Sequence, residues 1–251
     1  MILINESNTG ELVLDDGLNF GLGAFETIKI SNGGKAILLE EHIERLKNTL
    51  NALNIKKEIS VDKIYKYITS NNLKNIAFKI LVTSENIVFS TRSIPYTSDY
   101  YKRGFNVYFS EYRRNSKSLL TYHKTLNYGE NILEKRNAFT LGFDEPLFLN
   151  ERYEITEGAT TNIFFIKNNE IYTPKICSGL LNGILRQWVI DNFKVHEGLY
   201  TLEDLKSSHE IFLTNSLMGI MKVNKIEGYD LNLKYEKTYE ILKTYLDFEE
   251  R

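Results

Sequence analysis

A lysine and a glutamate in two short segments are the residues of this chain whose types and spacing could do chemistry. The first segment, Thr121-Tyr-His-Lys-Thr-Leu-Asn-Tyr128, places Lys124 just before a predicted helix, beside a histidine, an asparagine and a tyrosine. The second, Ile155-Thr-Glu-Gly-Ala-Thr-Thr-Asn-Ile-Phe164, places Glu157 beside a glycine at a predicted strand end. A lysine amine can form a Schiff base with an aldehyde, and a carboxylate can keep a ring nitrogen protonated.

This pair of residues is what pyridoxal 5'-phosphate chemistry requires. The lysine would hold the cofactor's aldehyde, and the carboxylate would keep the pyridine ring able to accept electrons from a carbanion. Each residue alone also has an ordinary interpretation. The chain holds 31 lysines and arginines, so Lys124 could be a surface lysine, and Glu157 could be a turn carboxylate before Gly158. The prediction therefore depends on further features in the same chain.

Two further features could bind a phosphate. Gly183 precedes a helix predicted to begin at Ile184, and the N–H groups and dipole of a helix N-terminus favour an anion. Arg45 lies in another predicted helix, and its guanidinium matches the geometry of phosphate oxygens. The alternatives are an ordinary glycine turn before a helix, and a solvated arginine paired with Glu41 or Glu44.

The elements that must position these residues mix strands and helices without regular βαβ order. Alternating β-branched and aromatic residues predict strands over 1–5, 24–31, 76–83, 87–91, 105–112, 146–149, 152–156, 160–167, 170–173, 209–214 and 220–223. Apolar residues at helical spacing predict helices over 40–53, 61–70, 129–141, 184–193 and 235–248. The turn Asn32-Gly-Gly34 predicts a hairpin that returns through Ala36 to Leu39.

This pattern predicts an α+β fold of two lobes. Residues 113–120 are polar and form the best linker candidate in the chain. We therefore predict an N-terminal α+β lobe over 1–113, a linker over 114–121, and a C-terminal α+β lobe over 122–251 that carries Lys124.

Composition excludes several classes of protein. The 251 residues carry a net charge of −2, and no basic cluster is interleaved with aromatic residues, so neither nucleic acid nor a membrane is an expected partner. The single cysteine, Cys177, rules out an intrachain disulfide, and no metal-ligand spacing occurs. The N-terminus resembles no signal peptide, and no apolar run is long enough to span a membrane. We expect a cytoplasmic protein.

Six motifs in one order resemble the fold-type IV family of pyridoxal phosphate enzymes, which includes branched-chain aminotransferases, D-amino acid aminotransferases and aminodeoxychorismate lyases. The motifs cover nearly the whole chain. They are Phe20-Gly-Leu-Gly-Ala-Phe-Glu-Thr27, His42-Ile-Glu-Arg-Leu46, His123-Lys-Thr-Leu-Asn-Tyr128, Thr156-Glu-Gly-Ala-Thr-Thr-Asn-Ile-Phe164, Leu181-Asn-Gly-Ile-Leu-Arg186 and Phe212-Leu-Thr-Asn-Ser-Leu-Met-Gly-Ile-Met221.

The resemblance implies a D-amino acid aminotransferase-like fold, a homodimer, and a cofactor between the two lobes. It also implies roles. Lys124 would be the Schiff-base lysine and proton shuttle, and Glu157 would pair with the pyridine nitrogen. The phosphate would be bound by Arg45, the turn at Gly183, the N–H groups of Ile184 and Leu185, and the hydroxyl of Ser216. Tyr128 would lie near the cofactor.

Within the family, the closest similarity is to aminodeoxychorismate lyase. The stretch Thr214-Asn-Ser-Leu-Met-Gly-Ile-Met221 resembles that branch more than the Gly-Thr-Ala pattern of branched-chain aminotransferases. The Arg-Gly-x-x-x-Arg-x-His pattern of D-amino acid aminotransferases is absent. One departure is that Thr83–Arg92 lacks the Ser-Arg-Gly segment that such lyases often carry. Candidate substrate-binding residues are Phe25, Arg92, Arg113 and Asn215.

The implied reaction converts 4-amino-4-deoxychorismate to p-aminobenzoate and pyruvate, in folate biosynthesis. The alternative is a class IV aminotransferase acting on branched-chain or D-amino acids, since both enzymes would use the same cofactor-binding residues. A third possibility, from another class, is a catalytically idle protein that only binds the cofactor. An idle relative would have no need to retain Lys124.

Overall fold

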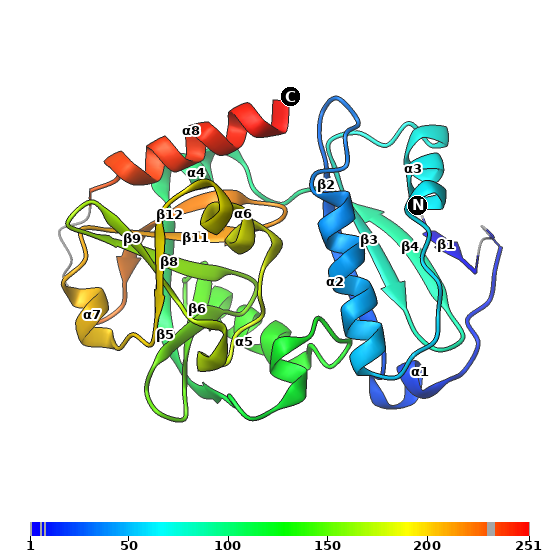
Figure 1. Cartoon of the computed structure of the whole chain (residues 1–251), viewed down its shortest axis with the longest axis horizontal. Helices are drawn as coiled ribbons and strands as arrows, with labels where there is room; N and C mark the ends of the chain where they lie inside the picture. Colours follow the sequence, from blue (N-terminus) through cyan, green and yellow to red (C-terminus); the bar gives the residue numbers. More distant parts are fainter. Residues whose placement is uncertain (1, 6, 8, 230–233, 251) are drawn as a thin grey trace. The chain divides into compact units, whose positions relative to one another are not determined.

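The computed structural model describes residues 2–5, 7, 9–229 and 234–250 and divides the chain into two compact units (Figure 1). The first unit contains the described residues up to Pro95 together with His123–Tyr128. The second contains Tyr96–Tyr122 and the described residues from Gly129 onward. Each unit has its own sheet and helices, so the predicted α+β class is confirmed.

A four-stranded antiparallel sheet in the order β1-β4-β3-β2 forms the centre of the first unit. Two helices, α2 (Leu39–Ala52) and α3 (Val61–Ser70), share one apolar core with one face of this sheet. Because side chains alternate across a strand, every second residue of β2 and β3 points away from that core. The strands are β1 (Ile2–Ile4), β2 (Ala24–Ile30), β3 (Ile76–Val82) and β4 (Ile87–Arg92).

The second unit contains an eight-stranded sheet in the order β10-β9-β8-β11-β12-β5-β6-β7, and a further pairing of β7 with β8 closes six of these strands into a ring. Strand β5 runs parallel to both β6 and β12. Helix α8 (Glu236–Glu250) packs on β11 and β12 (Figure 1). The strands are β5 (Phe105–Arg114), β6 (Glu145–Asn150), β7 (Ile155–Gly158), β8 (Asn162–Lys167), β9 (Glu170–Pro174), β10 (Val195–Gly198), β11 (Glu210–Asn215) and β12 (Gly219–Ile226).

The remaining elements are short, apart from the two helices α5 (Gly129–Thr140) and α6 (Ile184–Asn192). The sequence pattern predicted both of these helices within one residue of their bounds. It did not predict strand β10 or three helices of five or six residues, which are too short to show a periodic apolar face. These helices are α1 (Asp16–Phe20), α4 (Ser98–Arg103) and α7 (Leu202–Lys206), and two single 3-10 turns are η1 (Leu119–Tyr122) and η2 (Ile176–Ser178).

The predicted hairpin after residue 34 is wrong in its second half. The turn forms, and the Ser31 N–H donates to the Lys35 carbonyl at 2.8 Å. Beyond it the chain makes only an isolated bridge between Ile30 and Ala36, and α2 begins at Leu39. Leu39, which we predicted as the end of the returning strand, is instead the first residue of α2. Its side chain is completely buried and faces the core.

The compact units also differ from the lobes that we predicted. Strand β5 pairs with β6 and β12, so residues 105–113 belong to the second unit, and the strand continues into the proposed linker as far as Arg114. The segment around Lys124 belongs to the first unit. There the Phe25 N–H donates to the Lys124 carbonyl at 3.0 Å, and the Leu126 N–H donates to the Gly23 carbonyl at 2.9 Å. Long-range backbone pairing of this kind leaves no local signal in the sequence.

Among the described residues, no helix combines the length and the apolar character that crossing a membrane would need.

Candidate active site

Lys124 lies beside two aromatic rings in the first unit. Its segment forms a bridge from Thr125 to Ala24, at the start of β2. The Lys124 Nζ is 4.4 Å from the centroid of the Phe25 ring and 5.1 Å from that of Tyr128. These two rings meet edge to face with their centroids 5.1 Å apart. The structure therefore brings together three residues that the sequence analysis selected separately.

A buried carboxylate, Glu26, orients Arg45. The Arg45 Nε donates to Glu26 Oε1 at 2.7 Å and Nη2 donates to Oε2 at 2.8 Å, a two-point pairing. The Nε and Nη2 atoms of Arg45 therefore pair with Glu26. The alternative from the sequence was a pairing with Glu41 or Glu44. Burial alone would raise the pKa of Glu26, but Arg45 and His42 outweigh it and hold that pKa well below its ordinary value.

His42 completes this cluster from α2. Its Nδ1 lies 2.6 Å from Glu26 Oε2, and the ring is buried. Burial lowers the pKa of His42, and the positive charges of Arg45 and Lys124 lower it further, against the opposing pull of Glu26. A neutral ring beside a carboxylate must donate from Nδ1, so we assign that tautomer.

Sequence reasoning missed Glu26 although a signal was present. Positions 24, 28 and 30 of β2 are apolar and face the core, so Glu26 shares their face by the period of two. A carboxylate on such a face must find a cation, because an unpaired buried charge is strongly unfavourable. The arginine in the adjacent helix is that cation.

Sequence reasoning also missed Lys79, on the opposite face of the same sheet. In the register of β2 and β3, Lys79 lies opposite Thr27, two positions from Phe25. Its Nζ is 4.5 Å from the centroid of the Phe25 ring, so Lys79 and Lys124 both rest on one aromatic side chain. Burial lowers the pKa of Lys79, and the nearby Arg92 lowers it further. No ion pair joins Lys79 to an acidic group in the described part of the chain.

Glu157 lies in the second unit, on β7, and is 8% exposed. Its Oε2 accepts a hydrogen bond from the Leu181 N–H at 3.1 Å. Its Oε1 lies 3.3 Å from Nε of Arg114, the last residue of β5. The carboxylate is thus held between the turn that precedes α6 and a buried arginine that sequence reasoning did not select.

Gly183 is required where α6 begins. It has extended backbone and provides no side-chain cap for the helix. A Cβ at this position would lie 2.0 Å from Oδ1 of Asn162, whose Nδ2 donates to the Leu181 carbonyl at 2.9 Å. The glycine therefore allows the β8 strand to approach the first helical residues, Ile184 and Leu185, closely.

The turn between β11 and β12 carries Asn215 and Ser216. The Asn215 Oδ1 accepts hydrogen bonds from the Leu217 and Met218 N–H groups at 3.0 and 2.8 Å, and its Nδ2 donates to the Tyr96 hydroxyl at 3.1 Å. Asn215 thus has a clear structural task in this turn. Ser216 is the next residue and is partly exposed.

Register places three of these features at one end of the second sheet. Asn162 on β8 is the partner of Glu157 on β7 and of Thr214 on β11. The helix start at Gly183 lies against Asn162, and the Asn215–Ser216 turn follows Thr214 directly. The predicted carboxylate, helix N-terminus and hydroxyl therefore share an edge of the second unit, while Lys124 and Arg45 share the first unit.

The two arginines that we predicted as substrate ligands are held differently. Arg92 ends β4 on the first unit, exposed, and its Nη1 makes a long 3.4 Å contact with the Ser93 carbonyl. Arg113 lies on β5 of the second unit, and its Nη1 donates to the carbonyls of Ser110 and Glu111 at 2.8 and 3.0 Å. Backbone groups thus already engage Arg113, whereas Arg92 keeps most of its hydrogen-bonding capacity.

Comparison with known proteins identifies a family for this arrangement. A family model described as Amino-transferase class IV matches residues 23–226. A protein of Methanocaldococcus jannaschii, provisionally named a branched-chain-amino-acid aminotransferase, is 30% identical over 92% of this chain and 88% of its own length. The aminodeoxychorismate lyase of Bacillus subtilis is also 30% identical, over 85% of this chain and 80% of its own.

A solved structure shows that the fold is shared. The branched-chain amino acid aminotransferase of T.th., solved with pyridoxamine 5'-phosphate, has the same fold with a TM-score of 0.86 at 20% identity. The similarity covers 98% of this chain and 92% of that one. The predicted family and its cofactor are confirmed: the chain belongs to the class IV aminotransferases, fold-type IV enzymes that use pyridoxal 5'-phosphate.

Proposed function

We propose that this protein is a pyridoxal phosphate-dependent lyase that converts 4-amino-4-deoxychorismate to p-aminobenzoate and pyruvate. The observation that carries the proposal is Lys79. Its half-buried ammonium rests on the same Phe25 ring as Lys124 and has no acidic ion-pair partner within the described residues. A cation in that setting is stabilised by an anionic ligand.

The charge of this face favours a substrate with two carboxylates. Lys79 and Arg92 lie on the face of the first sheet that points away from the core, at alternate positions of paired strands. The amino group of the substrate would react at Lys124, and its ring carboxylate and enolpyruvyl carboxylate would each need a cation. A branched-chain amino acid has only one carboxylate, and its apolar side chain would leave a half-buried ammonium without a partner.

The residues of the site fit the cofactor. Lys124 supplies the amine that would hold it covalently, and Glu157 supplies a buried carboxylate that would keep the ring nitrogen protonated. Arg45 would bind the phosphate, and its pairing with Glu26 fixes the guanidinium plane in advance. The uncapped start of α6 and the hydroxyl of Ser216 would contribute further donors.

In this reaction the bound cofactor would supply the electron sink. Lys124 would take the proton from the ring carbon that bears the substrate nitrogen. The C–O bond to the enolpyruvyl group then breaks, the ring becomes aromatic, and Lys124 would return the proton to the methylene carbon of the departing enolpyruvate. Every atom of the substrate is then found in p-aminobenzoate and pyruvate, and no second substrate is needed.

An aminotransferase is the second candidate, and the names of several relatives favour it. The Methanocaldococcus jannaschii and Rickettsia relatives carry names of branched-chain-amino-acid aminotransferases at 29–31% identity. Such an enzyme would use Lys124 to move the proton onto the cofactor and would release a keto acid. The two candidates differ in what lies opposite Lys79: a second carboxylate in the lyase, an apolar side chain in the branched-chain aminotransferase.

We also propose that the protein is a homodimer. Both units expose large apolar side chains that a second copy could cover. Leu14 and Phe20 of the first unit are 73% and 68% exposed, and Leu133 and Phe139 of the second are 65% and 81% exposed. A second copy that covered these side chains would remove their apolar surface from water. Sedimentation equilibrium of the purified protein would give the mass directly, and a monomer at micromolar concentration would contradict this proposal.

The first experiment is a visible spectrum of the cofactor-loaded protein during addition of single amino acids without keto acid. The lyase is expected to keep its absorbance throughout the panel and then to form p-aminobenzoate from 4-amino-4-deoxychorismate. Bleaching by one amino acid would instead establish the aminotransferase and name its donor. A Lys124→Ala protein should lose the covalent absorbance, and failure to lose it would refute the role of Lys124.

A further inference from the structure

A buried arginine, Arg114, accompanies Glu157 in the second unit. It is 7% exposed, and its guanidinium carbon lies 4.0 Å from the centroid of the Phe148 ring. Its Nη1 donates to Asn131 Oδ1 at 3.2 Å and lies 3.6 Å from Oε2 of Glu130. A guanidinium has five N–H donors, yet here Nε and Nη2 are buried without a hydrogen-bond partner among the described residues. The arginine is therefore poorly used as a hydrogen-bond donor.

The positive charge of Arg114 has a close partner, although two of its nitrogens donate no hydrogen bond within the described residues. Its Nε is 3.3 Å from Oε1 of Glu157, close enough for an ion pair but without hydrogen-bond geometry. The two side chains are only 8% and 10% exposed, so water and salt screen this attraction little. The Leu181 N–H, which donates to the other oxygen of the Glu157 carboxylate, carries no net charge. Glu130 is half exposed, so its own charge is largely screened.

Two local features of the fold fix the position of Arg114. Strand β5 has an irregularity between Phe109 and Arg113 where it pairs with β6, after which Arg114 lies opposite Asn150. The chain is then held directly after this point. The Ser116 N–H and hydroxyl donate to the two carboxylate oxygens of Glu151 at 3.1 and 2.5 Å, and Arg152 donates to the Ser116 hydroxyl at 2.9 Å.

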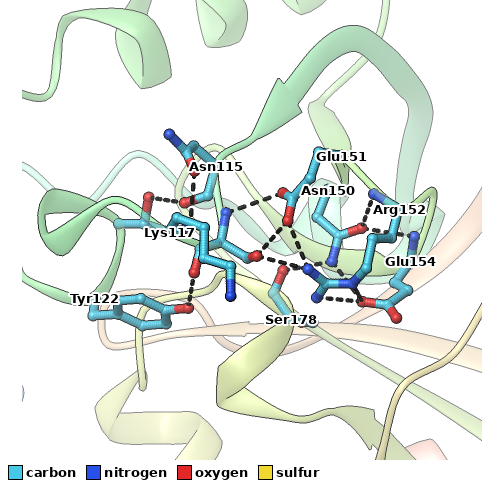
Figure 2. A network of polar contacts seen from close by, with 10 residues as sticks. Asn115, Lys117, Tyr122, Asn150, Glu151, Arg152, Glu154 and Ser178 are labelled. Atoms are coloured by element: carbon cyan, nitrogen blue, oxygen red, sulfur yellow. Dashed lines mark hydrogen bonds and ion pairs between the residues drawn. The ribbon is translucent and has the colours of Figure 1, made fainter.

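Figure 2 shows this network, which links residues directly after the end of β5 to the turn after β6. Asn150 and Arg152 both donate to Glu154, at 2.6 and 2.8 Å, while the Tyr122 hydroxyl donates to the Ser116 carbonyl at 2.7 Å. The contacts join the corner after Arg114 to the β6–β7 hairpin, and β7 carries Glu157. The network therefore holds the chain directly after Arg114 and the turn that leads into β7, the strand of Glu157.

The turn after Glu157 is fixed in the same way. The buried Glu145 accepts hydrogen bonds from the Thr160 N–H at 2.6 Å and from the Thr161 hydroxyl at 3.1 Å, and it pairs with Lys135. Asn131, which accepts from Arg114, donates to the Ala159 carbonyl at 2.7 Å. Arg114 and Glu157 are thus held together from both sides.

We infer that Arg114 is a positioning residue that keeps Glu157 ionised, so that the proton shared between this carboxylate and the cofactor's ring nitrogen stays on the ring. The inference rests on the proposed role of Glu157. An adjacent cation stabilises a carboxylate against protonation, and it acts more strongly on the group it touches than on the ring beyond. Without Arg114, Glu157 would be a buried charge that keeps only the electrostatic attraction of Arg186, which is itself paired with Glu197, and it would take up the proton more readily.

The test measures protonation of the ring without any substrate. Holoenzyme is prepared with pyridoxal 5'-phosphate labelled with ¹⁵N in the ring, and the ¹⁵N chemical shift reports whether that nitrogen carries a proton. Arg114→Met keeps an unbranched apolar stem but loses both the charge and the guanidinium that stacks on Phe148. We expect a protonated ring in the wild type and a neutral ring in Arg114→Met. Because the contact lacks hydrogen-bond geometry, Arg114→Lys should keep the ring protonated.

Matched controls separate this role from a general effect on folding. Arg103 is also stacked on an aromatic ring, 5.3 Å from the centroid of Tyr100, and also pairs with a carboxylate, Asp144. Arg103→Met should leave the ring nitrogen protonated. A protonated ring in Arg114→Met would overturn the inference, as would a neutral ring in Arg114→Lys together with Arg103→Met. If Arg114→Met does not fold, Arg114→Gln carries the same test.

Cofactor affinity gives a second readout. Arg114→Met should weaken binding of pyridoxal 5'-phosphate by about tenfold or more and leave binding of the analogue with carbon in place of the ring nitrogen unchanged. Equal weakening of both would show a merely structural role and overturn the inference. Glu157→Gln serves as the reference: a ring that stays protonated there would refute the role of Glu157 itself, and the inference with it. None of these outcomes depends on which substrate the enzyme uses.

Discussion

At the scale of single residues, Lys79 and Lys124 contact the same aromatic ring but would have different roles. Their Nζ atoms lie 4.5 and 4.4 Å from the centroid of Phe25. Lys124 would do the proton transfer, and Lys79 would hold an anion of the substrate. A cation that only binds should affect ground state and transition state equally, so its loss should appear in KM rather than in kcat.

This reasoning predicts the effect of Lys79→Met. The variant should raise KM for 4-amino-4-deoxychorismate by about 10- to 100-fold with kcat nearly unchanged, because a charged hydrogen bond contributes about 1.5–3 kcal/mol. Lys79→Arg should recover part of the loss. Lys102→Met, at a side chain that is 79% exposed, is the control and should change neither constant. Steady-state kinetics of p-aminobenzoate formation would measure both, and an unchanged KM in Lys79→Met would contradict the proposed substrate.

The Glu26 carboxylate predicts a stability effect at the same scale. Glu26→Gln would leave the largely buried charge of Arg45 without its two-point partner, and breaking a buried ion pair destabilises a protein by about 3–5 kcal/mol. Arg45→Gln/Glu26→Gln together should lose less than the two single losses combined, because neither charge is then left alone. Urea unfolding would measure the free energies, and additive losses would show that the pair is not coupled.

At the scale of elements, the start of α6 can pack against Asn162 because residue 183 is a glycine. Gly183→Ala would place a methyl group 2.0 Å from the Asn162 side chain, and such overpacking costs about 1–3 kcal/mol. Since the same turn would bind the cofactor's phosphate, the dissociation constant for pyridoxal 5'-phosphate should rise, by about tenfold for each 1.4 kcal/mol. Fluorescence titration of the apoenzyme would measure it.

Gly129→Ala is the matched control for this prediction. Gly129 also begins a helix, α5, but a Cβ there would meet nothing within 4 Å. It should therefore leave cofactor binding unchanged. Adding Asn162→Ser to Gly183→Ala should restore affinity if the clash is the cause, and no restoration would locate the defect elsewhere.

The same elements show what the sequence could and could not predict. Helix α3 was predicted over 61–70, its observed bounds, and its buried residues Ile64 and Ile68 repeat at helical spacing. Lys124 and Glu157 were selected from local motifs alone. The alternation of β2 could have placed Glu26 on the core face, but its pairing with Arg45 depends on the packing of α2 against the sheet. The position of Lys79 beside Phe25 depends on the register of β2 with β3. Long-range pairing decides which lysine among many is buried beside an aromatic ring.

At the scale of the whole molecule, the acid limit of stability should depend on His42. Its pKa is lowered in the fold, chiefly by burial, so the folded protein binds this proton less readily than the unfolded chain does. The stability that a neutral His42 provides is therefore complete above its unfolded pKa, about 6.5, and is lost as the pH falls below that value. One such proton changes the free energy of unfolding by at most about 1.4 kcal/mol per pH unit.

Asn at position 42 can place an N–H near the site of Nδ1 without titrating, so His42→Asn isolates this effect. We expect its free energy of unfolding to be lower than that of the wild type at pH 8 but to fall less steeply between pH 6.5 and 5. His123, whose pKa burial also lowers, should account for part of the slope that remains. Urea unfolding at each pH would measure the slopes, with His196→Asn as a partly exposed control. Equal slopes in wild type and His42→Asn would mean that folding does not change the pKa of His42, and would contradict the prediction. A wild type that falls less steeply than His42→Asn would mean that the Glu26 carboxylate keeps His42 protonated in the fold, and the assigned tautomer would then be wrong.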